Sequence, residues 1–179
     1  MKKPVALAML LALALILGSA SALAESYAIS GVGSVQLPDG YDVDDTTYTY
    51  EDTDASQWKF LAADSEMLLE CYFDQLDDYA GVSLANDSPE ELQAYIDATV
   101  AAFTNDSTAV SVVETVRGDS GVPFVIYAMT DDIGSFYYAE TILNGWCLSL
   151  SFYTEAGDTL PVSRLPELRT ILSSFQPAV

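Results

Sequence analysis

Apolar residues repeat at helical spacing in the middle of the chain. They recur every three or four positions, at Leu92, Tyr95, Ile96, Val100 and Phe103. Immediately before this run, Ser88 is a favourable N-cap, Pro89 suits the first helical position, and Glu91 completes a capping box with Ser88. The pattern predicts a helix that starts at Pro89 and turns one apolar stripe toward a core.

A second helix is expected near the end of the chain, over residues 163–175. Its apolar stripe consists of Leu165, Leu168, Leu172 and Phe175. Pro166 is tolerated because it lies in the first turn, where a backbone N–H has no partner within the helix. This helix, like the first, is expected to cover a core with one face.

The remaining apolar runs are short and typical of strands. Before the first helix, we expect one strand or two over residues 26–37, a turn at 38–40, and a hairpin of residues 57–62 with 66–74. After it come four strand-like runs, at residues 108–117, 122–129, 134–143 and 146–153. Short connections make consecutive strands antiparallel. The predicted class is α+β, an antiparallel sheet with one helix inserted mid-chain and a C-terminal helix.

The Asn144-Gly145 pair predicts a two-residue type I′ turn, which fixes the register of the last two strands. One face would be apolar and would pair Leu143 with Trp146, Thr141 with Leu148, Ala139 with Leu150 and Tyr137 with Phe152. The other would mix aromatic and hydroxyl groups and would pair Ile142 with Cys147, Glu140 with Ser149, Tyr138 with Ser151 and Phe136 with Tyr153. This second face either packs under a helix or meets a ligand. The candidate ligand face consists of Tyr138, Glu140, Ser149, Ser151 and Tyr153.

The first 24 residues have the three parts of an export signal. Lys2 and Lys3 supply positive charge, residues 5–17 form an uncharged apolar run, and residues 22–24 present small side chains to a signal peptidase. The apolar run is shorter than the roughly 20 residues that a spanning helix needs. We therefore expect cleavage of residues 1–24, which would leave a single domain over residues 25–179, secreted or extracytoplasmic and without a stable membrane anchor.

Cleavage would also sharpen an already acidic composition. It would leave four basic residues against 27 acidic ones, a net charge of −23. Such a charge keeps a protein dispersed, and it argues against nucleic acid or an anionic membrane as a partner. It favours cations, basic surfaces or no partner at all.

The two cysteines, Cys71 and Cys147, suggest a disulfide because the chain is expected to be exported. Strand alternation argues against it. Cys71 lies among apolar residues on its strand, whereas Cys147 lies on the face opposite Trp146. If both apolar faces point into one layer, the two sulfurs are on opposite sides of the sheet. We therefore favour two thiols over the disulfide.

The order of these elements resembles a known family. The chain enters residues 37–41, Leu-Pro-Asp-Gly-Tyr, from an aromatic-flanked strand, continues through one capped helix and an antiparallel meander, and ends with a helix that reaches Phe175. In this it looks like the PsbP-like fold family, which includes an extrinsic photosystem subunit, a Ran-binding relative and bacterial exported proteins. The resemblance implies a three-layer α/β/α sandwich and a binding or assembly role. It implies no catalytic residues.

The polar residues form no complete catalytic or cofactor motif. The chain has no histidine, which removes histidine-assisted nucleophiles and the usual zinc ligand sets. Three acidic pairs could supply acid and base for hydrolysis, Asp44-Asp45, Asp77-Asp78 and Asp131-Asp132. Adjacency alone does not place two carboxylates across a cleft, so we expect solvated loop charge. No cofactor is expected, and we lean toward a non-enzyme.

Two loop motifs stay open as alternatives. Residues 38–56 carry seven acids and no base, and residues 52–56 match the start of an EF-hand loop, but Gln57 and Ala63 then break the pattern. Loose calcium binding by residues 39–54 is the resulting hypothesis. A candidate adhesion turn consists of Arg117, Gly118 and Asp119, for which a plain Gly-Asp turn is the simpler interpretation.

The sequence thus predicts a secreted non-enzymatic binding or accessory module, with an unknown protein or small ligand as its partner. A carboxylate-dependent extracellular hydrolase is the alternative, and a calcium-binding or adhesion protein is the third hypothesis.

Overall fold

The computed structural model describes residues 23–29, 32–49, 56–62, 67–75, 79–132, 134–154 and 159–178. Within five strands, the description of residues 23–25, 42–49, 56–62, 67–75 and 153–154 is confined to the backbone. Residues 1–22 of the predicted export signal lie outside the described residues, so that prediction stays a prediction. The expected cleavage site, before Glu25, lies within the first strand.

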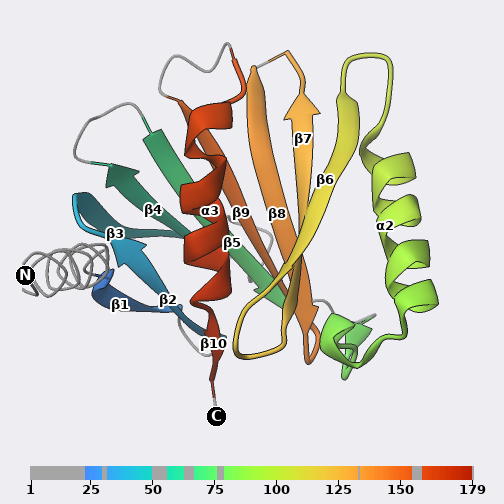
Figure 1. The fold of residues 1–179 in the computed structure, drawn as a ribbon, viewed down its shortest axis with the longest axis horizontal. Helices are drawn as coiled ribbons and strands as arrows, with labels where there is room; N and C mark the ends of the chain where they lie inside the picture. Colours follow the sequence, from blue (N-terminus) through green and yellow to red (C-terminus); the bar gives the residue numbers. More distant parts are fainter. Residues whose placement is uncertain are drawn as a thin grey trace, which may run out of the picture.

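The described elements follow the predicted order (Figure 1). The part before the first helix contains β1 (Leu23–Ile29), β2 (Gly33–Pro38), β3 (Tyr41–Thr49), β4 (Ser56–Ala62) and β5 (Met67–Gln75). A short 3₁₀ turn, η2 (Leu84–Asn86), and α2 (Pro89–Phe103) come next. The meander consists of β6 (Ala109–Arg117), β7 (Pro123–Thr130), β8 (Ser135–Leu143) and β9 (Trp146–Thr154). The chain ends with η3 (Val162–Arg164), α3 (Leu165–Ser173) and β10 (Gln176–Pro177).

The described strands form two antiparallel sheets. The large sheet has the order β3-β4-β5-β9-β8-β7-β6, and the small sheet has the order β1-β2-β10. Figure 1 shows α3 lying across the middle of the large sheet and α2 standing beside β6 at one side. The predicted antiparallel α+β arrangement is therefore confirmed, with a second small sheet added to it.

Strand β7 shows why the molecule has layers on both sides of the large sheet. Phe124 and Ile126 belong to the core under α3, whereas Val125 and Tyr127 belong to the core under α2. All four side chains have 0% exposure. Since successive strand residues point to opposite faces, a strand with consecutive buried residues needs cover on both faces. The helices supply this cover, as expected for an α/β sandwich.

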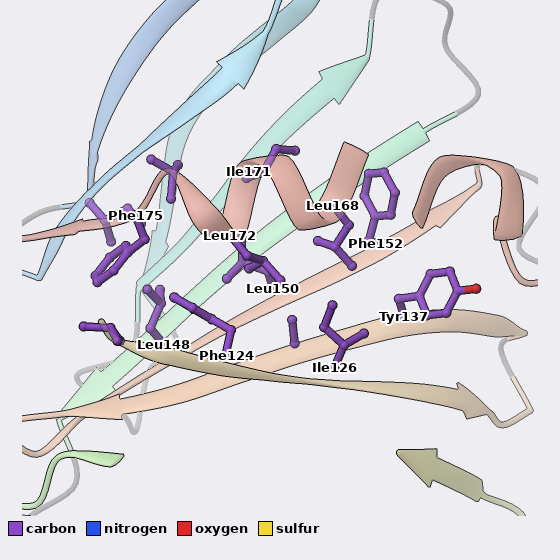
Figure 2. Packing of buried hydrophobic residues seen from close by; sticks show 14 of the residues in the cluster. Phe124, Ile126, Tyr137, Leu148, Leu150, Phe152, Leu168, Ile171, Leu172 and Phe175 are labelled. Carbon is purple, nitrogen blue, oxygen red and sulfur yellow. The ribbon is translucent and has the colours of Figure 1, made fainter. Parts of the chain in front are cut away.

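The larger core lies between α3, the small sheet and one face of the large sheet (Figure 2). Leu168, Ile171 and Leu172 of α3 pack against the apolar face of β8 and β9. Phe175 follows the helix and meets Phe124 edge to face, with ring centroids 5.3 Å apart. Burying each such side chain contributes roughly 1.5–3 kcal/mol. This core holds the end of α3 firmly against the sheet.

The predicted last hairpin is confirmed in detail. Asn144 and Gly145 have positive φ angles of 51° and 87°, as a type I′ turn requires. The pairs run from Leu143 with Trp146 to Tyr137 with Phe152, in the predicted register. The prediction for the first part of the chain was less complete, because β3 runs through the acidic segment, to which no strand was assigned from the sequence.

Backbone register also bears on the cysteines. On neighbouring strands β5 and β9, Cys71 pairs with Leu150 and Cys147 pairs with Asp74. The two cysteines are thus three positions out of register. An odd offset in neighbouring strands corresponds to opposite faces of a sheet. The backbone register thus agrees with the expectation from the sequence that the two cysteines lie on opposite faces, which disfavours a disulfide.

Candidate functional site

Glu140 lies in the middle of β8, on the face of the large sheet that α2 covers. Its register partners are Val125 on β7 and Ser149 on β9. Glu140 is 4% exposed and Ser149 is 6% exposed. A glutamate so far from water is uncommon unless its oxygens have partners.

Two phenols hold the Glu140 carboxyl group. The Tyr95 hydroxyl donates to Oε1 over 2.8 Å, and the Tyr138 hydroxyl donates to Oε2 over 3.2 Å. Tyr138 lies two residues before Glu140 on the same strand face, whereas Tyr95 comes from the apolar stripe of α2. The helix therefore contributes a polar contact from the middle of its buried side.

The position of α2 over this carboxyl follows from its local sequence. Ser88 Oγ accepts from the Glu91 backbone N–H, and Glu91 Oε2 accepts from the Ser88 N–H, so the predicted capping box is present. Leu92 and Ile96 are buried against Val125 and Ile142 of the sheet. The cap fixes where the helix begins, and this stripe fixes which side faces Glu140.

Burial raises the pKa of Glu140, while the hydrogen bonds from Tyr95 and Tyr138, and the nearby hydroxyls of Thr99 and Tyr127, lower it by stabilising the ionised form. The net direction is upward. The pKa values of the three phenols are raised as well, first by burial and then by the nearby Glu140 carboxylate. The phenols therefore remain protonated and available as donors at ordinary pH.

The Tyr127 hydroxyl is the least satisfied member of this group. It is buried close to Thr99 and Glu140, yet it has no hydrogen-bond partner of good geometry in the part of the chain that is described. Its ring lies 6.3 Å from that of Tyr138, which in turn meets Phe103 of α2 edge to face at 5.6 Å. The carboxyl is thus enclosed by an aromatic wall that separates it from solvent.

The candidate ligand face is only partly open. The structure buries Glu140 and Ser149 beneath the helix layer and leaves Tyr138 and Ser151 half-buried. Tyr153 lies near the end of β9, at a position where only the backbone is described. For Glu140, the arrangement corresponds to the packed alternative of the sequence argument. Chemically, this buried carboxyl can take up and release a proton. Among the described side chains of the candidate ligand face, Tyr138 and Ser151 are the ones that a ligand could reach.

The Arg117-Gly118-Asp119 turn is tied to α3. Arg117 Nη1 donates to the Gly121 carbonyl over 2.9 Å, which closes the turn. Gly118 lies so close to the helix end that an added Cβ would be 1.9 Å from the Ser173 carbonyl oxygen. Asp119 is exposed. The turn thus has a packing role in addition to the adhesion hypothesis.

The other acidic candidates give little geometry. Asp131 Oδ1 accepts from the Gly134 N–H over 3.1 Å, a local turn contact. Asp77 and Asp78 lie outside the described residues, and the side chains of Asp44 and Asp45 are not described. Among the described residues, no three His, Cys, Asp or Glu side chains group as a metal site. Loose calcium binding by residues 39–54 stays a prediction.

Tyr95 and Thr99 were not recognised as polar partners from the sequence. Tyr95 was assigned to the apolar stripe because its spacing fits, and nothing local indicates that its hydroxyl meets a carboxyl 45 positions away. One signal was present, since a buried tyrosine usually finds a hydrogen-bond partner. That signal says that a partner exists without saying which residue it is.

The arrangement of layers defines an α/β sandwich with an antiparallel central sheet. The solution structure of cyanobacterial PsbP (CyanoP) from Synechocystis sp. PCC 6803 is similar, with a TM-score of 0.51 and 14% identity. The match covers 91% of this chain and 99% of that chain. The chain therefore has a PsbP-like fold, which confirms the resemblance at the level of the fold. No family model and no curated protein matches it. Among the described residues, no helix is long and apolar enough to cross a membrane.

Proposed function

We propose that this chain is a secreted, non-enzymatic binding or accessory module whose partner presents a basic protein surface. The observation that carries the proposal is the state of the described arginines. Arg164 forms an ion pair with Glu167, and Arg169 forms one with Glu114. Arg117 is bonded to the Gly121 carbonyl. Each of these three arginines thus has a partner within the chain itself.

The acidic side chains are distributed differently. Along α2 and the segment after it, Glu90, Glu91, Asp97 and Asp106 are exposed, and no lysine or arginine occurs between residues 87 and 106. A surface of one sign attracts an oppositely charged partner over about a Debye length, roughly 8 Å at physiological salt. The exposed side of α2 is therefore the best candidate for the first contact with a basic partner.

The test uses protein purified after expression of the full chain and immobilised on beads. Extracytoplasmic proteins of the source cells are passed over it at about 50 mM and about 500 mM salt, a change that strongly screens exposed charges. We expect a basic protein to be retained at low salt and released at high salt. The triple variant Glu90→Gln, Asp97→Asn, Asp106→Asn should not retain it.

A matched variant neutralises charge away from α2, with Asp39→Asn and Asp132→Asn. It should retain the basic protein nearly as well as the unmodified chain. The proposal is wrong if no basic protein is retained, or if retention is indifferent both to salt and to the α2 substitutions.

One observation favours the carboxylate-dependent hydrolase as a second candidate. Burial raises the pKa of Glu140, and a general acid needs a carboxyl of this kind. Such a hydrolase also needs a second carboxylate near the first. The side chains that affect the pKa of Glu140 carry hydroxyl groups, so they do not supply that second carboxylate. Release of nitrophenol from nitrophenyl glycosides by the full chain, abolished by Glu140→Gln, would favour this candidate over the binding module. Calcium binding by residues 39–54 and adhesion through the Arg117-Gly118-Asp119 turn stay hypotheses from the sequence.

A further inference from the structure

A groove of about 420 Å³ opens where the end of α3, the turn between β6 and β7, and the small sheet come together. Every lining side chain is polar, and those that could meet a ligand include Gln36, Asp119, Arg169, Ser173 and Gln176. The volume lies in the lower part of the range for small-ligand sites. These residues come from distant parts of the sequence, so only the folded chain brings them together.

Two opposite charges face this groove without meeting each other. Arg169 Nε donates a hydrogen bond to Glu114 Oε1 over 2.5 Å. The two terminal nitrogens of the guanidinium make no further hydrogen bond among the described residues. The Arg169 side chain is 44% exposed. Asp119 is exposed, and within the described part of the chain its carboxylate has neither a hydrogen bond nor an ion pair. A ligand can therefore reach both charges.

The backbone holds the two charges apart. Gly118 packs directly on the Ser173 carbonyl, which fixes Asp119 beside the last turn of α3. The carbonyl end of a helix carries partial negative charge, so it reinforces the attraction of this end of the groove for a cation. Arg169 lies one turn earlier on the helix, and its guanidinium suits a carboxylate. The groove is thus negative at one end and positive at the other.

We propose that this groove binds a zwitterionic ligand, a free α-amino acid or a short peptide, with its carboxylate on Arg169 and its ammonium group beside Asp119. A simple anion would be repelled by Asp119, and a simple cation would leave the remaining Arg169 donors unused, so a ligand with both charges fits best. The side-chain amides of Gln36 and Gln176 can donate to and accept from a peptide bond. This site shares no residue with the α2 surface. A test of the groove is therefore independent of a test of the basic partner.

The probe is the dipeptide Ala-Ala, added to protein purified after expression of the full chain and followed by calorimetry and by backbone amide NMR. We expect saturable binding, with the largest shifts at Ser173, Ser174 and Gln176. N-acetyl-alanine and alanine amide, which each lack one charge, should bind at least about tenfold more weakly. Equal binding of all three probes, or shifts confined to α2, would overturn the proposal.

Variants separate the two charges from the surrounding fold. Asp119→Asn and Arg169→Gln should each weaken Ala-Ala binding about tenfold or more. Glu114→Gln is the matched control, because it leaves both groove charges and removes the carboxylate that competes for Arg169, and it should bind Ala-Ala at least as tightly as the unmodified protein. No binding of Ala-Ala by the unmodified protein, or unchanged binding by both groove variants, would also exclude the site.

Discussion

Tyr95 of α2 donates a hydrogen bond to the buried carboxyl group of Glu140 on β8 across 2.8 Å. This contact joins the helix inserted mid-chain to the centre of the large sheet. It is one of two hydrogen bonds from phenols to this carboxyl within a largely apolar layer, which makes its energetics sensitive to pH and to small changes of side chain.

Glu140 should make the stability of the protein fall as the pH rises. Burial raises the pKa of the folded carboxyl above its unfolded value, so the folded state holds the proton more tightly. The stabilisation is complete below the unfolded pKa, near 4.3, and is lost as the pH rises through the folded value. In that pH window, Glu140→Gln should reduce the fall in the free energy of unfolding by up to about 1.4 kcal/mol per pH unit. Urea unfolding between about pH 4 and pH 8 measures it.

The control for this change is Glu90→Gln, on the exposed side of α2. It removes one negative charge without touching the buried group, and it should keep the slope of the unmodified protein. A Glu140→Gln protein with that same slope would show that the carboxyl is not desolvated as described.

Tyr95→Phe should lower the free energy of unfolding by about 1–3 kcal/mol, because it leaves a buried carboxyl oxygen with one donor fewer. It should also raise the pKa of Glu140 further, since the lost hydrogen bond favoured the ionised form. In the Glu140→Gln background the substitution should cost less, as a double-mutant cycle would show. Tyr79→Phe, at a residue that is 41% exposed, should be nearly neutral. Equal costs for Tyr95→Phe and Tyr79→Phe would contradict the contact.

Gly118→Ala should destabilise the protein by about 2 kcal/mol or more. The added methyl group would lie 1.9 Å from the Ser173 carbonyl oxygen, so either the turn or the end of α3 must move. Gly81→Ala is a useful comparison, because Gly81 has φ +79° but open space around it. It should cost only about 1 kcal/mol, from backbone conformation alone. Thermal unfolding that ranks Gly81→Ala as the worse change would exclude a close packing of the turn.

Ser88→Ala should cost about 1 kcal/mol, because it removes one half of the capping box at the start of α2. Amide hydrogen exchange should speed up mainly in the first turn of α2 and hardly at all in α3. Ser111→Ala, at an exposed position of β6, provides a neutral reference. Uniform acceleration in both helices would indicate a global effect in place of a lost cap.

Predictions from the sequence succeeded where local signals suffice. The Asn144-Gly145 turn sets the register of its hairpin without help from the rest of the chain, and the Ser88 cap sets the start of α2. Strand β3 was underestimated because its acidic residues disfavour strands, and pairing with β4 prevails over that preference. The meeting of Tyr95 with Glu140, and of Asp119 with Arg169 around one groove, depends on tertiary packing. No spacing along the chain encodes either.

Strand β10 has a consequence for the order of folding. Gln176 pairs with Ser34 and Pro177 with Gly33, and the Ala178 N–H donates to the Val32 carbonyl over 2.9 Å. Gly33 leaves no room for a side chain there, since a Cβ would be 2.5 Å from the Gln176 carbonyl oxygen. The β1-β2 hairpin precedes every other described strand in the sequence, whereas its third strand, β10, follows all of them. This sheet therefore cannot be completed until the elements between β2 and β10 have been synthesised.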